Sequence, residues 1–177
     1  MDILFLCVVI FLFLLAVFDL SVGVSNDAVN FLNSAIGSKA ASFKRIIIVA
    51  SVGVFIGAAM SNGMMEIARH GIFRPEHFSF YDLICIFMAV MVTDIILLDI
   101  FNSLGMPTST TVSMVFELLG ATFVVALIKM AGGIDLGFND LLNTEKALSV
   151  IMGIFLSVAI AFVFGTLAVS YTHLTLP

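Results

Sequence analysis

Residues 3–18 read ILFLCVVIFLFLLAVF, an apolar run that continues with little polar content to residue 22. This length is close to the roughly 20 apolar residues that an α-helix needs to cross a bilayer. Strands of a membrane barrel instead alternate polar and apolar residues. No Lys or Arg precedes the run and no small-residue cleavage pattern follows it. We therefore expect a membrane span and not a signal peptide.

The composition extends this prediction from one helix to a polytopic membrane protein. Of 177 residues, 62% are hydrophobic and 11% are charged, whereas soluble domains average roughly 25% charged residues. The chain has room for about five spans, which we expect at residues 3–22, 46–65, 81–101, 108–130 and 147–169. The predicted fold class is all-α, a polytopic transmembrane helical protein with broken helices. The net charge of −5 provides no basic patch, so nucleic acid is excluded as a partner.

The first polar interruption carries a stripe of carboxamides. The sequence GVSND at residues 23–27 follows the first apolar run, and we expect it to interrupt the helix. If the segment is helical, one face holds the residues at i, i+4, i+7 and i+11, which are Asn26, Asn30, Asn33 and Gly37. Asp27 lies one position round from Asn26. Neutral oxygens with one carboxylate suit a monovalent cation such as Na⁺, although amides also bridge membrane helices.

The second polar interruption combines a helix break with a run of hydroxyl groups. Gly105 and Pro107 end the third predicted span, and the sequence TSTT at residues 108–111 opens the next helix. A helix N-terminus presents free N–H groups and a partial positive charge, and hydroxyl groups beside it complete an anion cradle. A capped helix start without a ligand is the alternative. We predict a break between residues 103 and 108, with residues 109–111 facing a buried polar cavity.

Three further carboxyl groups lie within the predicted spans. An ionised carboxylate at mid-bilayer costs roughly 2.5 to 3.5 kcal/mol, so we expect Asp94, Asp99 and Glu117 to be paired, protonated or facing water. Asp94 and Asp99 are five residues apart and point to different sides of an ideal helix, which argues against an aspartyl-protease dyad. The sequence also lacks a Gly-x-Ser-x-Gly nucleophile elbow. We predict that the protein is not an enzyme.

Both interruptions resemble the signatures of a known transporter family. The sequence GVSNDAVN at residues 23–30, with SAIGSKA at residues 34–40, resembles the Gly-Ala-Asn-Asp-Val-Ala-Asn signature and the downstream Ser-Val-Gly-Ser of the inorganic phosphate transporter (PiT) family. The sequence GMPTSTT at residues 105–111 resembles the Pro-x-Ser-Thr-Thr-His segment of that family, although Val112 stands where His is common. The resemblance covers residues 1 to about 169.

The resemblance implies a cation-coupled symporter that carries inorganic phosphate with Na⁺ or H⁺. It assigns phosphate binding to Ser109, Thr110, Thr111 and Asp27, and a candidate Na⁺ site to Asn26, Asp27, Asn30 and Ser34. No cofactor is expected beyond the coupling ion. The alternatives are a sulfate permease on the same scaffold, a non-transporting helical membrane subunit and an intramembrane enzyme. We expect a multi-pass protein of the cell inner (plasma) membrane.

The resemblance also predicts the domain organisation. The resemblance implies an inverted repeat, in which both signatures recur in a second half of the protein. One copy of each signature occurs here. We expect residues 1–169 to be the amino-terminal transmembrane repeat of an anion symporter, and the tail SYTHLTLP at residues 170–177 to be non-native sequence at a truncation. The expected partners are inorganic phosphate, the coupling cation, the lipid bilayer, a missing carboxy-terminal repeat and, as an open alternative, a second copy in a homodimer.

Overall fold

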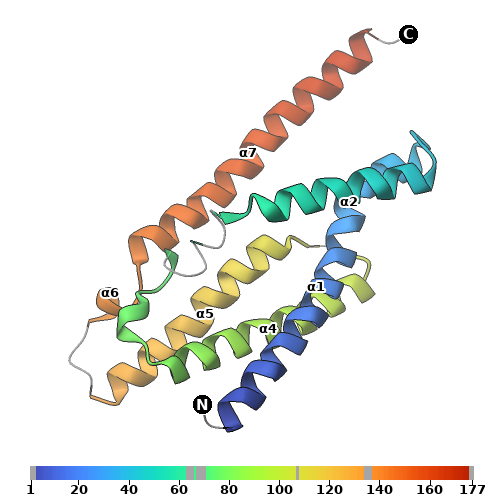
Figure 1. The fold of residues 1–177 in the computed structure, drawn as a ribbon. Helices are drawn as coiled ribbons and strands as arrows, with labels where there is room; N and C mark the ends of the chain where they lie inside the picture. Colours follow the sequence, from blue (N-terminus) through green and yellow to red (C-terminus); the bar gives the residue numbers. More distant parts are fainter. Residues whose placement is uncertain (1–2, 63–65, 67–70, 107, 134–136, 176–177) are drawn as a thin grey trace.

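The computed structural model describes the chain except for residues 1–2, 63–65, 67–70, 107, 134–136 and 176–177 (Figure 1). The described elements are α1 (Ile3–Gly37), α2 (Phe43–Ala59), η2 (Pro75–His77), α4 (Phe80–Ser103), α5 (Thr110–Ala131), α6 (Phe138–Leu141) and α7 (Thr144–Thr175). Four of these helices, α1, α4, α5 and α7, are long and apolar enough to cross a membrane. The predicted fold class, a polytopic helical membrane protein, is confirmed.

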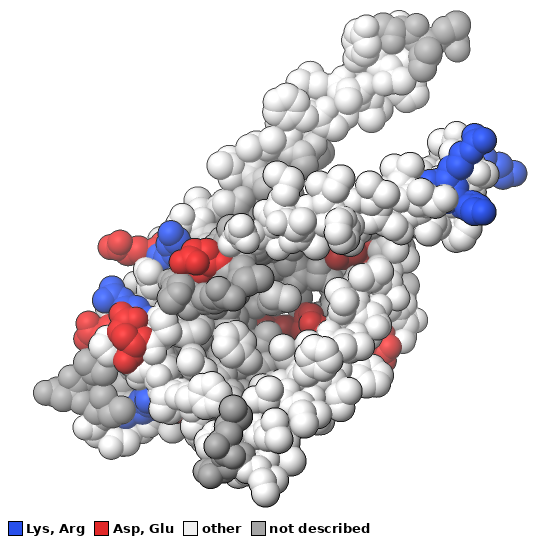
Figure 2. Space-filling model, in the orientation of Figure 1, with Lys and Arg blue, Asp and Glu red and all other residues white. Residues whose placement is uncertain are grey.

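The second predicted span is shorter than the sequence suggests. We expected a helix over residues 46–65, of which 63–65 lie outside the described residues, and α2 ends at Ala59 and has 17 residues. This length is at the lower end of the range of about 17 to 25 residues that a crossing needs, and α2 is not among the four candidate spans of the described chain. α1 and α2 form a hairpin whose tip carries the basic residues Lys39, Lys44 and Arg45 (Figures 1 and 2). Charge at the tip favours contact with water or lipid headgroups.

The first helix does not break where the sequence predicts. α1 is continuous through residues 23–27, so the expected interruption is wrong. Two serine hydroxyl groups donate to carbonyl oxygens one turn earlier, Ser21 to Val17 at 2.9 Å and Ser25 to Ser21 at 3.0 Å. Larger polar side chains of the same segment reach partners on another part of the chain. Because its side chains are satisfied in these ways, the segment has no need to unwind.

α4 and α5 form a hairpin whose connection is broken as the sequence predicts. α4 ends at Ser103 in a Schellman motif, in which the N–H groups of Met106 and Gly105 donate to carbonyl oxygens of the last helical turn at 3.0 and 3.1 Å. Gly105 has a φ of 68°, a left-handed conformation that glycine adopts without a steric penalty. α5 begins at Thr110, which confirms the predicted break, while Pro107 lies outside the described residues.

The buried core lies at the other end of the α4–α5 hairpin. Phe73 and Leu142 form an isolated antiparallel bridge, and the Arg74 N–H donates to the Leu141 carbonyl at 3.1 Å. These contacts tie the segment before α4 to the segment after α5. Ten apolar side chains pack together there: Ile72, Phe73, Phe78, Ile86, Val90, Val115, Leu118, Ala126, Leu141 and Leu142. α7 projects away from this core with an exposed apolar surface and includes residues 170–175 as helix (Figure 1).

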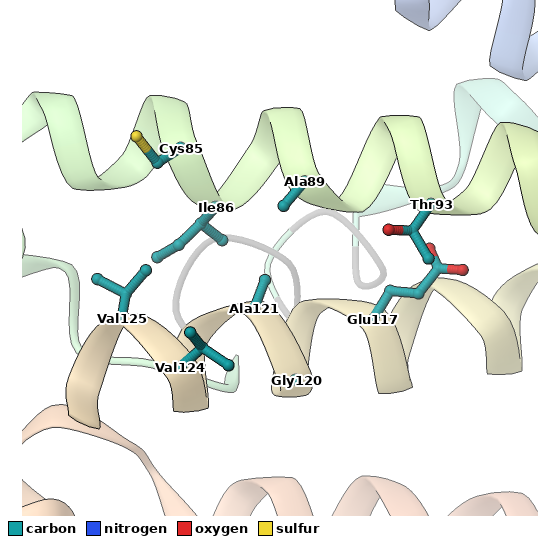
Figure 3. Close-up of a pocket in the computed structure, with 9 residues that line it drawn as sticks. All are labelled: Cys85, Ile86, Ala89, Thr93, Glu117, Gly120, Ala121, Val124 and Val125. Carbon is teal, nitrogen blue, oxygen red and sulfur yellow. The ribbon is translucent and has the colours of Figure 1, made fainter. Parts of the chain in front are cut away.

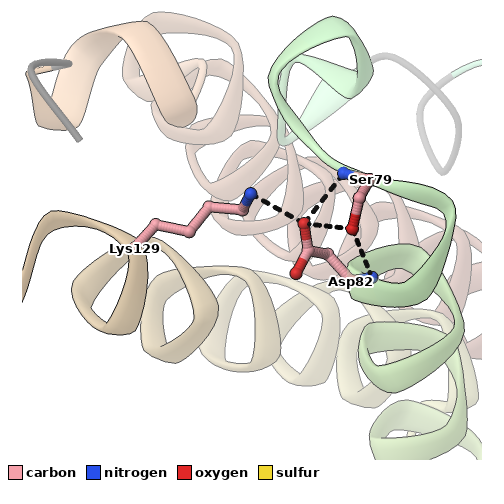
Figure 4. A network of polar contacts seen from close by, with 3 residues as sticks. All are labelled: Ser79, Asp82 and Lys129. Carbon is pink, nitrogen blue, oxygen red and sulfur yellow. Dashed lines mark hydrogen bonds and ion pairs between the residues drawn. The ribbon is translucent and has the colours of Figure 1, made fainter. Parts of the chain in front are cut away.

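An ion pair joins α4 to α5 at the same end (Figure 4). The Lys129 ammonium lies 2.7 Å from Oδ2 of Asp82, and 5.6 Å from the centre of the Phe78 ring. The same Asp82 oxygen accepts the Ser79 N–H at 2.8 Å, while the Ser79 hydroxyl oxygen accepts the Asp82 N–H at 3.2 Å. These two bonds form the capping box at the start of α4. One carboxylate therefore caps α4 and holds α5 beside it.

We expect Asp82→Ala to destabilise the protein by about 1 to 3 kcal/mol, because the substitution removes the cap and leaves Lys129 without its partner. Thermal unfolding of the purified protein in detergent measures this loss. Glu76→Ala is the control, since Glu76 is an exposed carboxylate at the same end of the molecule. Equal unfolding temperatures for the two variants would contradict the structural role assigned to Asp82.

Candidate functional site

A polar face of α1 lies against the break between α4 and α5. Asn26 on this face is fully buried. Asp27 is half-buried beside it, and Asn30 follows one turn farther along the helix. Figure 1 shows α1 crossing the α4–α5 hairpin on the side where the hairpin is broken. The carboxamide stripe identified in the sequence therefore meets the start of α5.

The carboxamide of Asn26 pairs with both polar groups of the Thr108 backbone. The Thr108 N–H donates to Asn26 Oδ1 at 3.0 Å, and the Asn26 amino group donates to the Thr108 carbonyl at 2.5 Å. The amino group of Asn30 donates to the same carbonyl at 3.0 Å. Thr108 lies between two helices, so it has no helical hydrogen-bonding pattern of its own. Two side chains of α1 therefore complete the backbone hydrogen bonds at the break.

The carboxylate of Asp27 contacts the first residue of α5. The Thr110 hydroxyl lies 3.1 and 3.2 Å from the two carboxylate oxygens and donates its proton to them. α1 also passes close to this threonine one turn earlier, where a Cβ placed on Gly23 would lie 3.7 Å from the Thr110 methyl group. That separation is an ordinary van der Waals contact. Side chains from the two sequence motifs therefore touch each other.

The start of α5 presents hydrogen-bond donors that the helix itself does not use. Ser109 is the N-cap, and its hydroxyl oxygen accepts the Val112 N–H at 3.4 Å. The N–H groups of Thr110 and Thr111 are the first of the helix and have no carbonyl within it to bind. The helix dipole adds a partial positive charge at the same point. These groups can bind an anion.

The structure brings together only part of the predicted site. Asn26, Asp27, Asn30 and Thr110 meet around Thr108. Ser109 and Thr111 are exposed on this chain, and Ser34 is exposed one turn beyond Asn30, whereas we predicted a buried polar cavity around residues 109–111. The Thr108 backbone was missed as a contact. A residue just before a helix N-cap has backbone groups that no helix satisfies, and this requirement could have pointed to the contact.

A second polar cluster links α4 and α5 within their predicted spans. The Ser113 hydroxyl lies 2.7 Å from Oδ1 of Asp94 and 2.8 Å from Oε1 of Glu117. A hydroxyl group has one proton, so both contacts are hydrogen bonds only if one carboxyl group is protonated and donates to Ser113. Asp19 of α1 lies near Asp94. In the described residues, three such acidic groups do not converge closely enough to hold a metal ion.

This cluster shows how the carboxyl groups within the predicted spans are accommodated. Asp94 is buried and paired through Ser113, as is the half-buried Glu117. One buried oxygen of Glu117 and one of Asp19 have no hydrogen-bond partner in the described part of the chain. Asp99 is exposed. Figure 2 shows acidic side chains recessed among uncharged ones in the middle of the molecule. The serine that joins them was not identified from the sequence.

A groove between α4 and α5 does not have the chemistry of an anion site (Figure 3). It has a volume of about 490 Å³ and is lined mainly by small and apolar side chains, among them Ile86, Ala89 and Ala121. The polar side chains that reach it are Thr93 and Glu117. An anion gains little from apolar walls and is repelled by an ionised carboxylate. The start of α5 is therefore the better candidate for an anion site.

Comparison with known protein families finds a match over most of the chain. The sequence profile of the phosphate transporter family matches residues 23–176, a range that includes both motifs. The chain belongs to the phosphate transporter family. The resemblance to inorganic phosphate transporters that the two motifs indicate is therefore confirmed. The family is one of transporters, which implies a transporter rather than an enzyme.

Two of the proteins similar to this chain carry the name "Putative phosphate permease". The one from Thermococcus kodakarensis is 33% identical over 104 residues, which cover 58% of this chain and 26% of that protein. The one from Pyrococcus furiosus is 28% identical over 146 residues, which cover 81% of this chain and 32% of that protein. The chain spans about a quarter to a third of the length of these relatives. No solved structure matches it.

We expect Ser113→Ala to destabilise this family member by about 1 to 3 kcal/mol, because two carboxyl groups in a spanning hairpin lose their shared partner. Thermal unfolding in detergent is the measurement. Ser157→Ala is the matched control, since the exposed Ser157 hydroxyl donates only to the Ile154 carbonyl of its own helix, at 2.7 Å. If both substitutions shift the unfolding temperature equally, Ser113 does not hold α4 to α5.

Proposed function

We propose that the protein carries inorganic phosphate across the membrane together with a cation, Na⁺ or H⁺. The observation that carries this proposal is the contact between the Asp27 carboxylate and the Thr110 hydroxyl. This contact brings a negative charge beside a helix start that attracts anions. Membership of the phosphate transporter family supports phosphate as the substrate, as do the names of the two relatives.

The anion would bind at the start of α5. The unused N–H groups of Thr110 and Thr111 would donate to phosphate oxygens, together with the hydroxyl groups of Ser109, Thr110 and Thr111. The exposure of Ser109 and Thr111 leaves both accessible to a ligand. The helix dipole would add to the attraction. Phosphate binding therefore needs no arginine at this point.

The cation would bind at Asp27. An ionised carboxylate next to an anion site repels the anion, so a bound cation or proton removes a barrier to phosphate binding. A carboxylate at membrane depth is also costly until a positive charge neutralises it. The oxygens of Asn30 and Ser34, on following turns of α1, would complete the set of ligands. The oxygen of Asn26, the remaining predicted ligand, already accepts the Thr108 N–H.

Thr110 would couple the two ions because its hydroxyl group has a single proton. It donates this proton to Asp27 in the structure. When a cation or proton neutralises Asp27, the hydroxyl is free to donate to a phosphate oxygen instead. Each ion then favours binding of the other, as linkage requires. Coupled binding of this kind is what a symporter needs.

Two alternatives make different use of the same residues. Sulfate lacks the proton with which hydrogen phosphate can donate to a carboxylate such as Asp27, which favours phosphate over a sulfate permease. A non-transporting subunit could bridge its helices with neutral amides and would have no need of a charge at this position. The four candidate spans support an integral membrane protein, and we propose the inner (plasma) membrane as its location.

We expect Asp27→Asn to abolish cation-dependent phosphate uptake while leaving membrane insertion unchanged. The substitution keeps the size of the side chain and removes its charge, so phosphate affinity should no longer rise when the cation is added, a gain that in the wild-type protein we expect to be roughly 5- to 150-fold, the usual range of coupling between two ligands. Uptake of radiolabelled phosphate by the full-length gene product in vesicles, with and without a sodium or proton gradient, measures the effect.

Asp99→Asn is the matched control, because Asp99 is an aspartate on the spanning helix α4 with an exposed side chain. It should retain cation-dependent uptake. If Asp27→Asn transports phosphate with the wild-type rate and cation dependence, Asp27 is a bridge between helices and the proposal of coupled transport fails.

We further expect Thr110→Val to weaken phosphate binding by roughly 10- to 150-fold, the effect of losing one hydrogen bond to a charged group. The variant should also show a smaller gain in phosphate affinity on adding the cation, because the exchangeable proton is gone. Thr110→Ser keeps the hydroxyl and should retain both properties. Calorimetric titration with phosphate provides the measurement, and an unchanged cation effect in Thr110→Val would disprove the coupling role.

A further inference from the structure

Asn26 differs from the other polar residues of the α1 face in how completely its side chain is used. It is fully buried, with 0% of its surface exposed. Its oxygen accepts the N–H of Thr108 and its nitrogen donates to the carbonyl of the same residue. A carboxamide paired in this way satisfies both the N–H and the carbonyl of one residue, as the backbone of a neighbouring β-strand would. A purely apolar residue here would leave both backbone groups without these bonds.

We propose that Asn26 is a positioning residue that holds the start of α5 in its anion-binding geometry, and that it is not a cation ligand. The inference rests on the proposed function, and it assigns a specific role within the same site. Asn30 supports Asn26 by donating a second hydrogen bond to the Thr108 carbonyl.

The position of Thr108 explains how Asn26 acts on the site. Thr108 precedes the N-cap Ser109 and lies two residues before Thr110. Fixing both its N–H and its carbonyl restricts the backbone just before the helix begins. The direction of the first N–H groups of α5 follows from that restriction. Asn26 therefore sets where the donors point without contacting the anion.

The same geometry gives the neighbouring polar residues of α1 different roles. The oxygen of Asn26 faces a backbone N–H at 3.0 Å, so a cation there would meet a bound donor. Asn30 holds the Thr108 carbonyl through its nitrogen, which leaves its oxygen for other partners. Asp27 contacts Thr110 and supplies the charge. Positioning and cation binding thus belong to different atoms of adjacent residues.

The test compares Asn26→Ala with Asn30→Ala, and uses Asn33→Ala as the matched control. Asn33 is an exposed asparagine of α1 that makes no contact with Thr108 in the described hydrogen bonds. The first measurement is hydrogen–deuterium exchange of residues 108–113 in the full-length gene product, without phosphate. The second is calorimetric titration with phosphate at saturating sodium, or at low pH if protons are the coupling ion.

We expect exchange of the Thr108 amide to rise by roughly tenfold in Asn26→Ala, because the amide loses its acceptor. Exchange of residues 108–113 should rise less in Asn30→Ala and stay unchanged in Asn33→Ala. Phosphate affinity at saturating cation should fall in the same order. The cation concentration for half-saturation should change little in Asn26→Ala, since a positioning residue does not bind the cation. A residue that only joined two helices would alter exchange without this selective loss of phosphate affinity.

Two results would overturn the inference. One is unchanged exchange of the Thr108 amide in Asn26→Ala. The other is wild-type phosphate affinity at saturating cation combined with a raised cation requirement, the behaviour of a cation ligand. If Asn26→Ala does not fold, Asn26→Ser, whose short side chain cannot make both hydrogen bonds, is compared with Asn33→Ser by the same criteria. If the wild-type protein binds no phosphate under any condition, the proposed function fails, while the exchange measurement still shows whether Asn26 holds the break.

Discussion

The hydrogen bonds between α1 and the Thr108 backbone are the interaction on which the site depends. A chain that leaves one membrane helix and begins another exposes N–H and carbonyl groups that lipid cannot satisfy. Here the partners come from a helix 82 residues earlier in the sequence. The break is therefore compatible with the membrane only while α1 lies against it. This constraint keeps the carboxylate of Asp27 beside the start of α5, where we propose that a cation and an anion bind next to each other.

The two ends of the α4–α5 hairpin are held together by different kinds of contact. The closed end combines an apolar core, a backbone bridge and the Asp82–Lys129 ion pair, all of which hold the helices in one register. The broken end is held by side-chain hydrogen bonds from α1. Between them, Ser113 joins carboxyl groups of both helices. In the function that we propose, ligands would bind and leave at the broken end while the closed end keeps the fold.

The sequence predicts those features that depend on local signals. Apolar runs indicate the helices, and Gly105 marks the end of α4. Two short motifs indicate the family, and they contain Asp27 and Thr110, which contact each other in the structure. The same reasoning fails at α1, because polar residues in a helix look like an interruption until their partners on α5 are known. It also misses Ser113, whose role depends on the register between α4 and α5. Contacts that join distant segments require the three-dimensional structure.

The most direct measurement is a high-resolution structure of the full-length gene product with phosphate and its coupling cation. We predict phosphate within hydrogen-bonding distance of the Thr110 and Thr111 N–H groups, with the cation or a proton on Asp27. The Thr110 hydroxyl should then point to phosphate. Phosphate bound elsewhere, for example in the groove between α4 and α5, with Thr110 still donating to Asp27, would contradict the claim that the two motifs form one coupled site.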